Sequence, residues 1–206
     1  MKRPGKVVCV GRNYREHARE LGNEIPPEPL IFLKPPSSVI GSGEPIVLPS
    51  LSERVEYEGE IGIVLRSTLR HASQVEARRA IRGVCAVNDV TARDLQKKDS
   101  QWTRAKGFDT FCPIGECHDL SDGDVLDGLE VITALNGSER QRGMAAQMAF
   151  SIPMLLAYIS RIMTLESGDV IATGTPAGVG PLSPGDVVEV CISGKSSVSN
   201  PVIAEG

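Results

Sequence analysis

One stretch of the sequence organises the rest of the chain: Val55-Glu56-Tyr57-Glu58-Gly59-Glu60-Ile61-Gly62-Ile63-Val64-Leu65. It passes from a carboxylate-rich start into an apolar run with β-branched residues, which predicts one strand over residues 55–65. Alternate side chains of a strand share a face, so Glu56, Glu58 and Glu60 are expected to project together. Like charges repel, and this arrangement therefore costs free energy unless solvent or a cation relieves it.

Two interpretations of these carboxylates are open. In the first, they form a solvated face at a strand end. In the second, they hold a metal ion. The apolar continuation favours the metal, because a strand that runs into Ile61, Ile63 and Val64 is expected to be central, with its acidic end opening into a cleft. Hard divalent cations such as Mg²⁺ take a few carboxylate oxygens and keep open positions for water or substrate.

Length, charge and cysteine content narrow the class of protein. The 206 residues fit a single domain spanning 1–206. The net charge of -4 and the lack of a long basic run argue against nucleic acid as a partner. No apolar stretch reaches the roughly 20 residues of a membrane span, and no signal-peptide core is present. The five cysteines form no CxxC pair, which predicts reduced thiols in a cytoplasmic protein.

The order of elements predicts the fold class. Short strands outnumber helices and do not alternate with them regularly, which indicates an α+β protein. We expect a β-rich mixed sheet that forms a coiled roll or open barrel with a few outer helices. One such helix is predicted from the capping box at Ser73 to Arg82, with Gly83 ending it.

A second polar cluster follows the apolar strand predicted at residues 84–87. Asp89 comes at the end of that strand, where a third carboxylate could meet Glu58 and Glu60. Residues 91–98 are predicted to be helical, with Arg93 and Gln96 on one face. An arginine fork pairs with a carboxylate, and glutamine adds a neutral hydrogen bond. The competing interpretation is a capped helix with a solvated polar face.

Three further features have the chemistry of a catalytic site. His17 and Glu20 are three residues apart on a short polar helix that Gly22 ends, and a carboxylate at this spacing orients a proton-accepting histidine. An exposed surface pair is the alternative. Lys106 lies among small and aromatic residues and is suited to an anionic substrate, although most lysines are simply solvated. The glycine-rich stretch 174–180, which includes Thr175, offers backbone N–H groups to an anion.

Together these clusters resemble the fumarylacetoacetate hydrolase superfamily, in its small single-domain acylpyruvate hydrolase branch. The resemblance extends over nearly the whole chain and rests on six motifs in order. They are Val10-Gly11-Arg12-Asn13-Tyr14 with His17, Phe32-Leu33-Lys34-Pro35, Glu58-Gly59-Glu60-Ile61-Gly62, Asp89-Val90-Thr91-Ala92-Arg93-Asp94-Leu95-Gln96, Ala105-Lys106-Gly107-Phe108-Asp109 and Thr173-Gly174-Thr175-Pro176-Ala177-Gly178-Val179-Gly180. The loop at residues 97–101 is shorter than in close relatives, which bears on substrate size.

The resemblance implies a set of roles. Mg²⁺ or Mn²⁺ is expected on Glu58, Glu60 and Asp89, with Glu56 left on the surface. The catalytic residues would be His17 and Glu20 on a lid together with Lys106, and the substrate contacts would be Arg93, Gln96, Lys106 and Thr175. The fold would be a mixed β-roll, assembled as a homodimer that acts on a small 2-oxo acid.

The expected reaction is metal-dependent hydrolysis of a C–C bond in an acylpyruvate-type 2,4-dioxo acid, giving pyruvate and a carboxylic acid. Oxaloacetate decarboxylation on the same site is the first alternative. Isomerisation or decarboxylation of unsaturated hydroxy-dicarboxylates, as in aromatic catabolism, is the second. A non-catalytic metal-binding protein is the alternative from another class, and the presence of His17, Glu20 and Lys106 beside three carboxylates argues against it.

Overall fold

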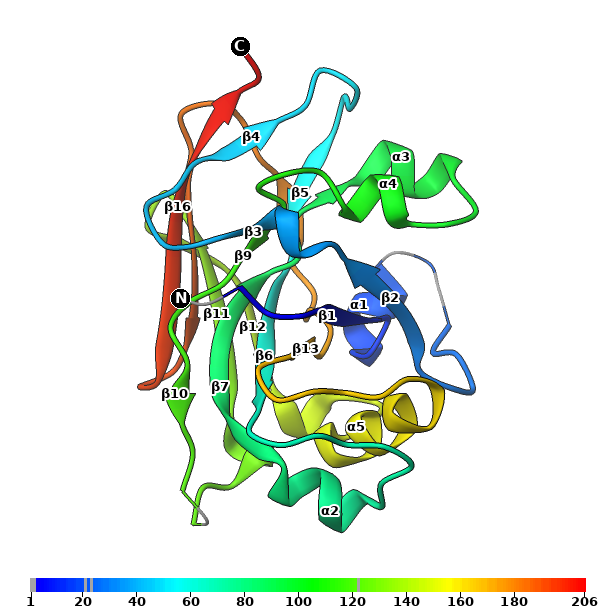
Figure 1. Cartoon of the computed structure of the whole chain (residues 1–206). Coiled ribbons are helices and arrows are strands. Elements are labelled where there is room, and N and C mark those ends of the chain that lie inside the picture. The colour runs from blue at the N-terminus through cyan, green and yellow to red at the C-terminus, as the bar shows by residue number, and fades with distance from the viewer. Residues whose placement is uncertain (1–2, 21, 23, 122) are drawn as a thin grey trace.

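The computed structural model describes residues 3–20, 22, 24–121 and 123–206. Two sheets dominate it, as Figure 1 shows. The first has the strand order β10-β7-β6-β13-β1-β2. Its strands are β1 (Val7–Gly11), β2 (Leu30–Lys34), β6 (Gly59–Leu65), β7 (Ile81–Asn88), β10 (His118–Asp119) and β13 (Val170–Ala172).

The second sheet has the order β12-β11-β15-β16-β4. Its strands are β4 (Ile46–Leu48), β11 (Glu130–Leu135), β12 (Ser138–Met144), β15 (Val187–Ile192) and β16 (Ser196–Ala204). Two small sheets complete the set, from β5 (Val55–Tyr57), β8 (Thr91–Ala92) and β14 (Gly180–Pro181), and from β3 (Val39–Ile40) and β9 (Cys112–Pro113).

The helices lie outside the sheets (Figure 1). They are α1 (Arg15–Glu20), α2 (Gln74–Arg79), α3 (Arg93–Lys98), α4 (Thr103–Lys106) and α5 (Ile152–Ile162), with 3-10 turns at Pro36–Ser38, Leu126–Gly128 and Ala145–Gln147. The predicted α+β class, β-rich with a few outer helices, is confirmed. No helix in the described part of the chain combines the length and apolar character needed to cross a bilayer.

The main core lies between the two large sheets. Ile61 and Ile63 of β6 pack in one buried cluster with Val131 of β11, Val190 of β15 and Leu155 of α5. Every residue of β6 is buried, and β6 lies between β7 and β13. The prediction that the acidic strand is central is therefore confirmed, and the start of β6 is held on both sides.

The predicted strand over residues 55–65 is wrong in one respect, because it is interrupted at Glu58. Residues 55–57 form β5, which pairs with β8 and β14, whereas β6 begins at Gly59. The Glu58 N–H donates to the side chain of Asn88 (3.0 Å), and its carbonyl accepts the N–H of Asp89 (2.8 Å). Because of this interruption, the continuous segment 55–65 contributes β5 to one of the small sheets and β6 to the first large sheet.

Two predicted helices have different ends. The capping box at Ser73 is present, but α2 ends at Arg79, because the chain enters β7 at Ile81 and Gly83 lies inside that strand. The helix predicted over residues 91–98 begins at Arg93, since residues 91–92 pair with β5. All five cysteines are free thiols.

Candidate active site

A cavity of about 560 Å³ opens where the start of β6, the end of β7 and α1 meet. It is lined by every residue that the sequence assigned to the site: His17, Glu20, Glu58, Glu60, Asp89, Arg93, Gln96, Lys106 and Thr175. These residues come from segments more than 150 positions apart, and the fold brings all of them to one place.

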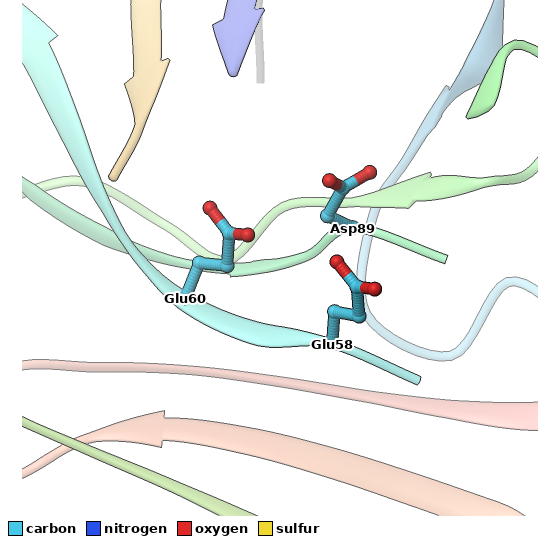
Figure 2. A group of neighbouring side chains, drawn as sticks. All are labelled: Glu58, Glu60 and Asp89. Carbon is cyan, nitrogen blue, oxygen red and sulfur yellow. The ribbon is translucent and has the colours of Figure 1, made fainter. Parts of the chain in front are cut away.

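Three carboxylates converge in this cavity, as Figure 2 shows. Glu58, Glu60 and Asp89 are buried, and each offers an oxygen within 4.8 Å of the other two. The register of β6 against β7 causes this, because Gly59 pairs with Asn88 and so places Asp89 beside Glu58. Gly59 is required between the two glutamates, since a Cβ there would lie 1.9 Å from Oγ1 of Thr133.

Three buried cations surround the carboxylates. Nζ of Lys106 donates to Oε2 of Glu58 (2.8 Å) and Oδ2 of Asp89 (2.7 Å). Nζ of Lys34 donates to Oδ1 of Asp89 at 2.6 Å. Arg93 donates to Oε1 of Glu58 at 2.5 Å. A buried charge is tolerated when it is paired and hydrogen-bonded, so these contacts hold both partners in place.

Glu60 lacks such a cation among the described residues and accepts only the N–H of Gly174, at 2.8 Å. Burial and the neighbouring charges of Asp89 and Glu58 raise the pKa of Glu60 well above its usual range. Burial also opposes ionisation of Glu58, but Lys106 and Arg93 outweigh it and lower the pKa of that carboxyl. The site is therefore short of positive charge at Glu60.

A divalent cation would supply the missing charge. With Glu56, four buried carboxylates face three buried cations. The donor set consists of carboxylate oxygens, the ligands that Mg²⁺ and Mn²⁺ prefer over nitrogen and sulfur. By both charge and chemistry, the residues fit Mg²⁺ or Mn²⁺.

His17 and Glu20 face the same cavity from α1. The His17 side chain is buried, and its Nδ1 lies 3.1 Å from Oε2 of Glu20. Because the carboxylate accepts the Nδ1 proton, Nε2 is left as a proton acceptor in the neutral ring. The burial of His17 contradicts the alternative of an exposed surface pair.

Glu20 is also held by the glycine-rich loop. The N–H of Gly178 donates to both oxygens of Glu20, at 3.0 and 3.2 Å. Gly178 has a φ of +99° and lies so close to β12 that a Cβ would meet the Arg140 carbonyl oxygen at 2.1 Å. The hydrogen bond from the Gly178 N–H to the Glu20 carboxylate, called the latch below, holds α1 over the cavity.

Gly178→Ala is expected to lower stability and to weaken catalysis. The left-handed φ alone costs about 1–3 kcal/mol for a non-glycine residue, and the collision moves the N–H away from Glu20. Thermal unfolding and steady-state kinetics of the variant measure the two effects.

Gly185→Ala is the matched control, because Gly185 has a φ of +95° and open space around its Cβ position. It should lose stability through backbone strain but keep its activity. Equal loss of activity in both variants would contradict a specific role for the latch.

The surface placement expected for Glu56 is wrong. Glu56 is 3% exposed, and its Oε2 accepts from Nε of Arg93 at 2.6 Å. The same guanidinium donates to Glu58 and to Gln96. Glu56 therefore orients Arg93, which in turn orients Glu58. The pairing of β5 with β8 creates this contact, and local sequence gives no sign of it.

Two further buried residues hold the site and were not assigned to it from the sequence. Lys34 binds Asp89, and the available signals were its position at the end of an apolar strand and its place in the motif Phe32-Leu33-Lys34-Pro35. Gln141 accepts the N–H of Gly59 (2.9 Å) and donates to Oγ1 of Thr175 (2.8 Å). It thus ties the carboxylate-bearing strand to the glycine-rich loop. Residues 138–142 of its strand are all polar, so no pattern singles it out.

Several known proteins are similar to this chain in both sequence and architecture. The chain is 45% identical to an oxaloacetate decarboxylase, mitochondrial, of Dictyostelium discoideum, over 92% of this chain and 89% of the relative. The structure of a 5-carboxymethyl-2-hydroxymuconate delta-isomerase from Mycobacterium smegmatis superposes with a TM-score of 0.90 at 43% identity, covering 99% of this chain and 80% of that one.

A fumarylpyruvate hydrolase from Pseudomonas aeruginosa, solved in complex with Mn²⁺ and pyruvate, superposes with a TM-score of 0.90 at 30% identity. The match covers 97% of this chain and 90% of the hydrolase. The sequence model described as fumarylacetoacetate (FAA) hydrolase C-terminal matches residues 6–203. Since that match takes in both large sheets and every residue of the cavity, the chain belongs to the fumarylacetoacetate hydrolase family.

Proposed function

We propose that the protein is a divalent-metal-dependent hydrolase that cleaves a C–C bond of acylpyruvate-type 2,4-dioxo acids, releasing pyruvate and a carboxylic acid. The observation that carries the proposal is the placement of three converging carboxylates and a buried His17–Glu20 pair in one cavity. The fumarylpyruvate hydrolase with Mn²⁺ and pyruvate supports it by similarity.

Glu58, Glu60 and Asp89 would hold the Mg²⁺ or Mn²⁺ ion. When bound, such an ion acts as a Lewis acid that polarises carbonyl oxygens and stabilises the developing enolate charge. It would also change the formal charge of the buried cluster from negative to positive, which suits an anionic 2-oxo acid. Arg93, Gln96 and Thr175 line the same cavity and would contact this substrate.

His17 is the proposed general base. Its Nε2 would take a proton from water, and the water oxygen would attack the distal carbonyl of the substrate. The C–C bond between that carbon and the methylene group would then break, so that the distal part leaves as the carboxylic acid and the pyruvate enolate takes up a proton at its methylene carbon. Glu20 would hold the ring in the required tautomer and stabilise the imidazolium that forms. Lys106 would donate to the oxygen on which negative charge develops. The closed position of α1 would exclude bulk water from these steps.

Oxaloacetate decarboxylation is the second candidate, favoured by the relative of that name at 45% identity. Loss of CO₂ yields the same enolate of pyruvate without an attacking water. Isomerisation of an unsaturated hydroxy-dicarboxylate is a further candidate, favoured by the isomerase from Mycobacterium smegmatis. A homodimer in the cytoplasm, expected from the sequence, stays a prediction.

A substrate panel tests the proposal directly. Acylpyruvates, oxaloacetate and unsaturated hydroxy-dicarboxylates are assayed for product with Mg²⁺, with Mn²⁺ and with excess chelator. We expect pyruvate from the acylpyruvates with either metal and none with chelator. Full activity in excess chelator would overturn the metal requirement. If no panel member is converted and none shifts the melting temperature in Mg²⁺, the non-catalytic alternative replaces the enzyme.

A further inference from the structure

Arg12 has a backbone conformation that an arginine rarely adopts. It follows the last residue of β1 with a φ of +58°, in the left-handed region. Outside glycine, this region is populated mainly by asparagine and aspartate, and it is unfavourable for other side chains. A residue of the wrong type at such a position indicates that its side chain is needed there.

The neighbours of Arg12 fix this conformation. The backbone at Gly11 packs against the indole of Trp102, since a Cβ there would lie 2.9 Å from the ring. Asn13 is fully buried, and its Nδ2 donates to the carbonyl of Thr173 at 2.8 Å while its Oδ1 accepts the N–H of Phe150 at 2.9 Å. The chain therefore turns sharply between two fixed residues.

The side chain of Arg12 lines the active-site cavity without a partner. Within the described residues its guanidinium makes no ion pair and no hydrogen bond. By contrast, the buried cations Lys34, Arg93 and Lys106 are each paired with a carboxylate. The Asp99 carboxylate also lines this cavity, but Arg104 binds it with two nitrogens, at 2.8 and 2.5 Å.

We propose that Arg12 binds a second carboxylate of the substrate, distal to its 2-oxo acid end, and thereby selects dicarboxylic 2-oxo acids. A guanidinium fork pairs bidentately with a carboxylate, and no described carboxylate of the cavity is hydrogen-bonded to Arg12, since Asp99 is bound by Arg104 and Glu60 accepts the N–H of Gly174. The inference rests on the proposed function in one respect, because it places the 2-oxo acid end at Glu58, Glu60 and Asp89.

Matched pairs of unreactive 2-oxo acids test the subsite by binding alone. The probes are 2-oxoglutarate and 2-oxoadipate, each compared with the acid that has a methyl group in place of the distal carboxylate, 2-oxopentanoate and 2-oxohexanoate. Calorimetric titration with the Mg²⁺-loaded protein gives each dissociation constant. We expect the dicarboxylate to bind about 10- to 100-fold more tightly for at least one chain length, as for a hydrogen-bonded charge pair.

Arg12→Asn is the decisive variant, because asparagine suits the left-handed backbone and the protein should melt at the same or a higher temperature. It is expected to reduce the preference for the dicarboxylate to less than about threefold. Arg12→Gln is the second variant, which keeps a longer side chain and likewise removes the charge. Arg15→Gln, an exposed arginine on α1, is the control and should keep the full preference.

Three outcomes would overturn the subsite: no preference in the wild type at either length, an undiminished preference in both Arg12 variants, or equal loss in Arg15→Gln. A failure of the proposed function looks different. In that case the wild type and Arg15→Gln would still prefer the dicarboxylates, while pyruvate release from every acylpyruvate in the panel would be absent.

Discussion

Glu58→Gln is expected to lower pyruvate release by about three orders of magnitude or more. A bound metal contributes several kcal/mol of transition-state stabilisation, and each 1.4 kcal/mol corresponds to tenfold in rate. The amide removes one of three converging charges and also breaks the ion pairs of Glu58 with Arg93 and Lys106. Steady-state kinetics and Mn²⁺ titration of the variant measure the loss.

Glu189→Gln is the matched control, since it makes the same substitution at an exposed position of β15. It should bind Mn²⁺ and turn over as the wild type does. Circular dichroism is used to check that Glu58→Gln is folded before its kinetics are compared. An unchanged Mn²⁺ affinity in Glu58→Gln would contradict the assignment of this carboxylate as a ligand.

His17→Ala is expected to slow acylpyruvate hydrolysis much more than oxaloacetate decarboxylation. Loss of a general base lowers hydrolysis by about 10²- to 10⁴-fold. Decarboxylation of oxaloacetate needs no activated water, so its rate should fall far less. Both rates are measured with the same enzyme preparation in Mg²⁺, on an acylpyruvate and on oxaloacetate.

The exposed His118 provides the control, and His118→Ala should leave both rates unchanged. If His17→Ala slows the two reactions equally, His17 does not activate the hydrolytic water. In that result, His17 would instead act in a step common to both reactions, such as protonation of the enolate.

Local patterns in the sequence were sufficient to predict the three carboxylates at the centre of the site. The alternation of Glu58 and Glu60 ahead of an apolar run predicted a central strand with two carboxylates at its start, and the structure has Glu60 in the central strand β6 and Glu58 directly before it. Asp89 followed a second apolar strand, β7, which pairs with β6. Adjacent buried strands bring their ends together, so the convergence of the three acids was predictable.

Contacts between distant segments were not predictable in the same way. Glu56 meets Arg93 because β5 pairs with β8, a strand of two residues that has no periodicity of its own. Gln141 reaches Gly59 across the gap between the two large sheets. Such contacts depend on tertiary packing, which overrides local propensity.

Tertiary packing also decides where helices and strands end. α2 stops at Arg79 although residues 80–82 have ordinary helix-forming character, because the following residues pair with β6 in the main sheet. The strand interruption at Glu58 arises where one segment leaves β8 and joins β7 as its partner. In both cases, the hydrogen bonds gained in a sheet decide the boundary.

The central claim is that Glu58, Glu60 and Asp89 together bind one divalent ion. Anomalous diffraction at the manganese edge, from crystals grown with Mn²⁺, tests it most directly. We expect a single strong peak in the cavity, bonded to one oxygen of each of the three carboxylates. A map without that peak, in which Nζ of Lys106 still bridges Glu58 and Asp89 in the presence of saturating Mn²⁺, would contradict the claim.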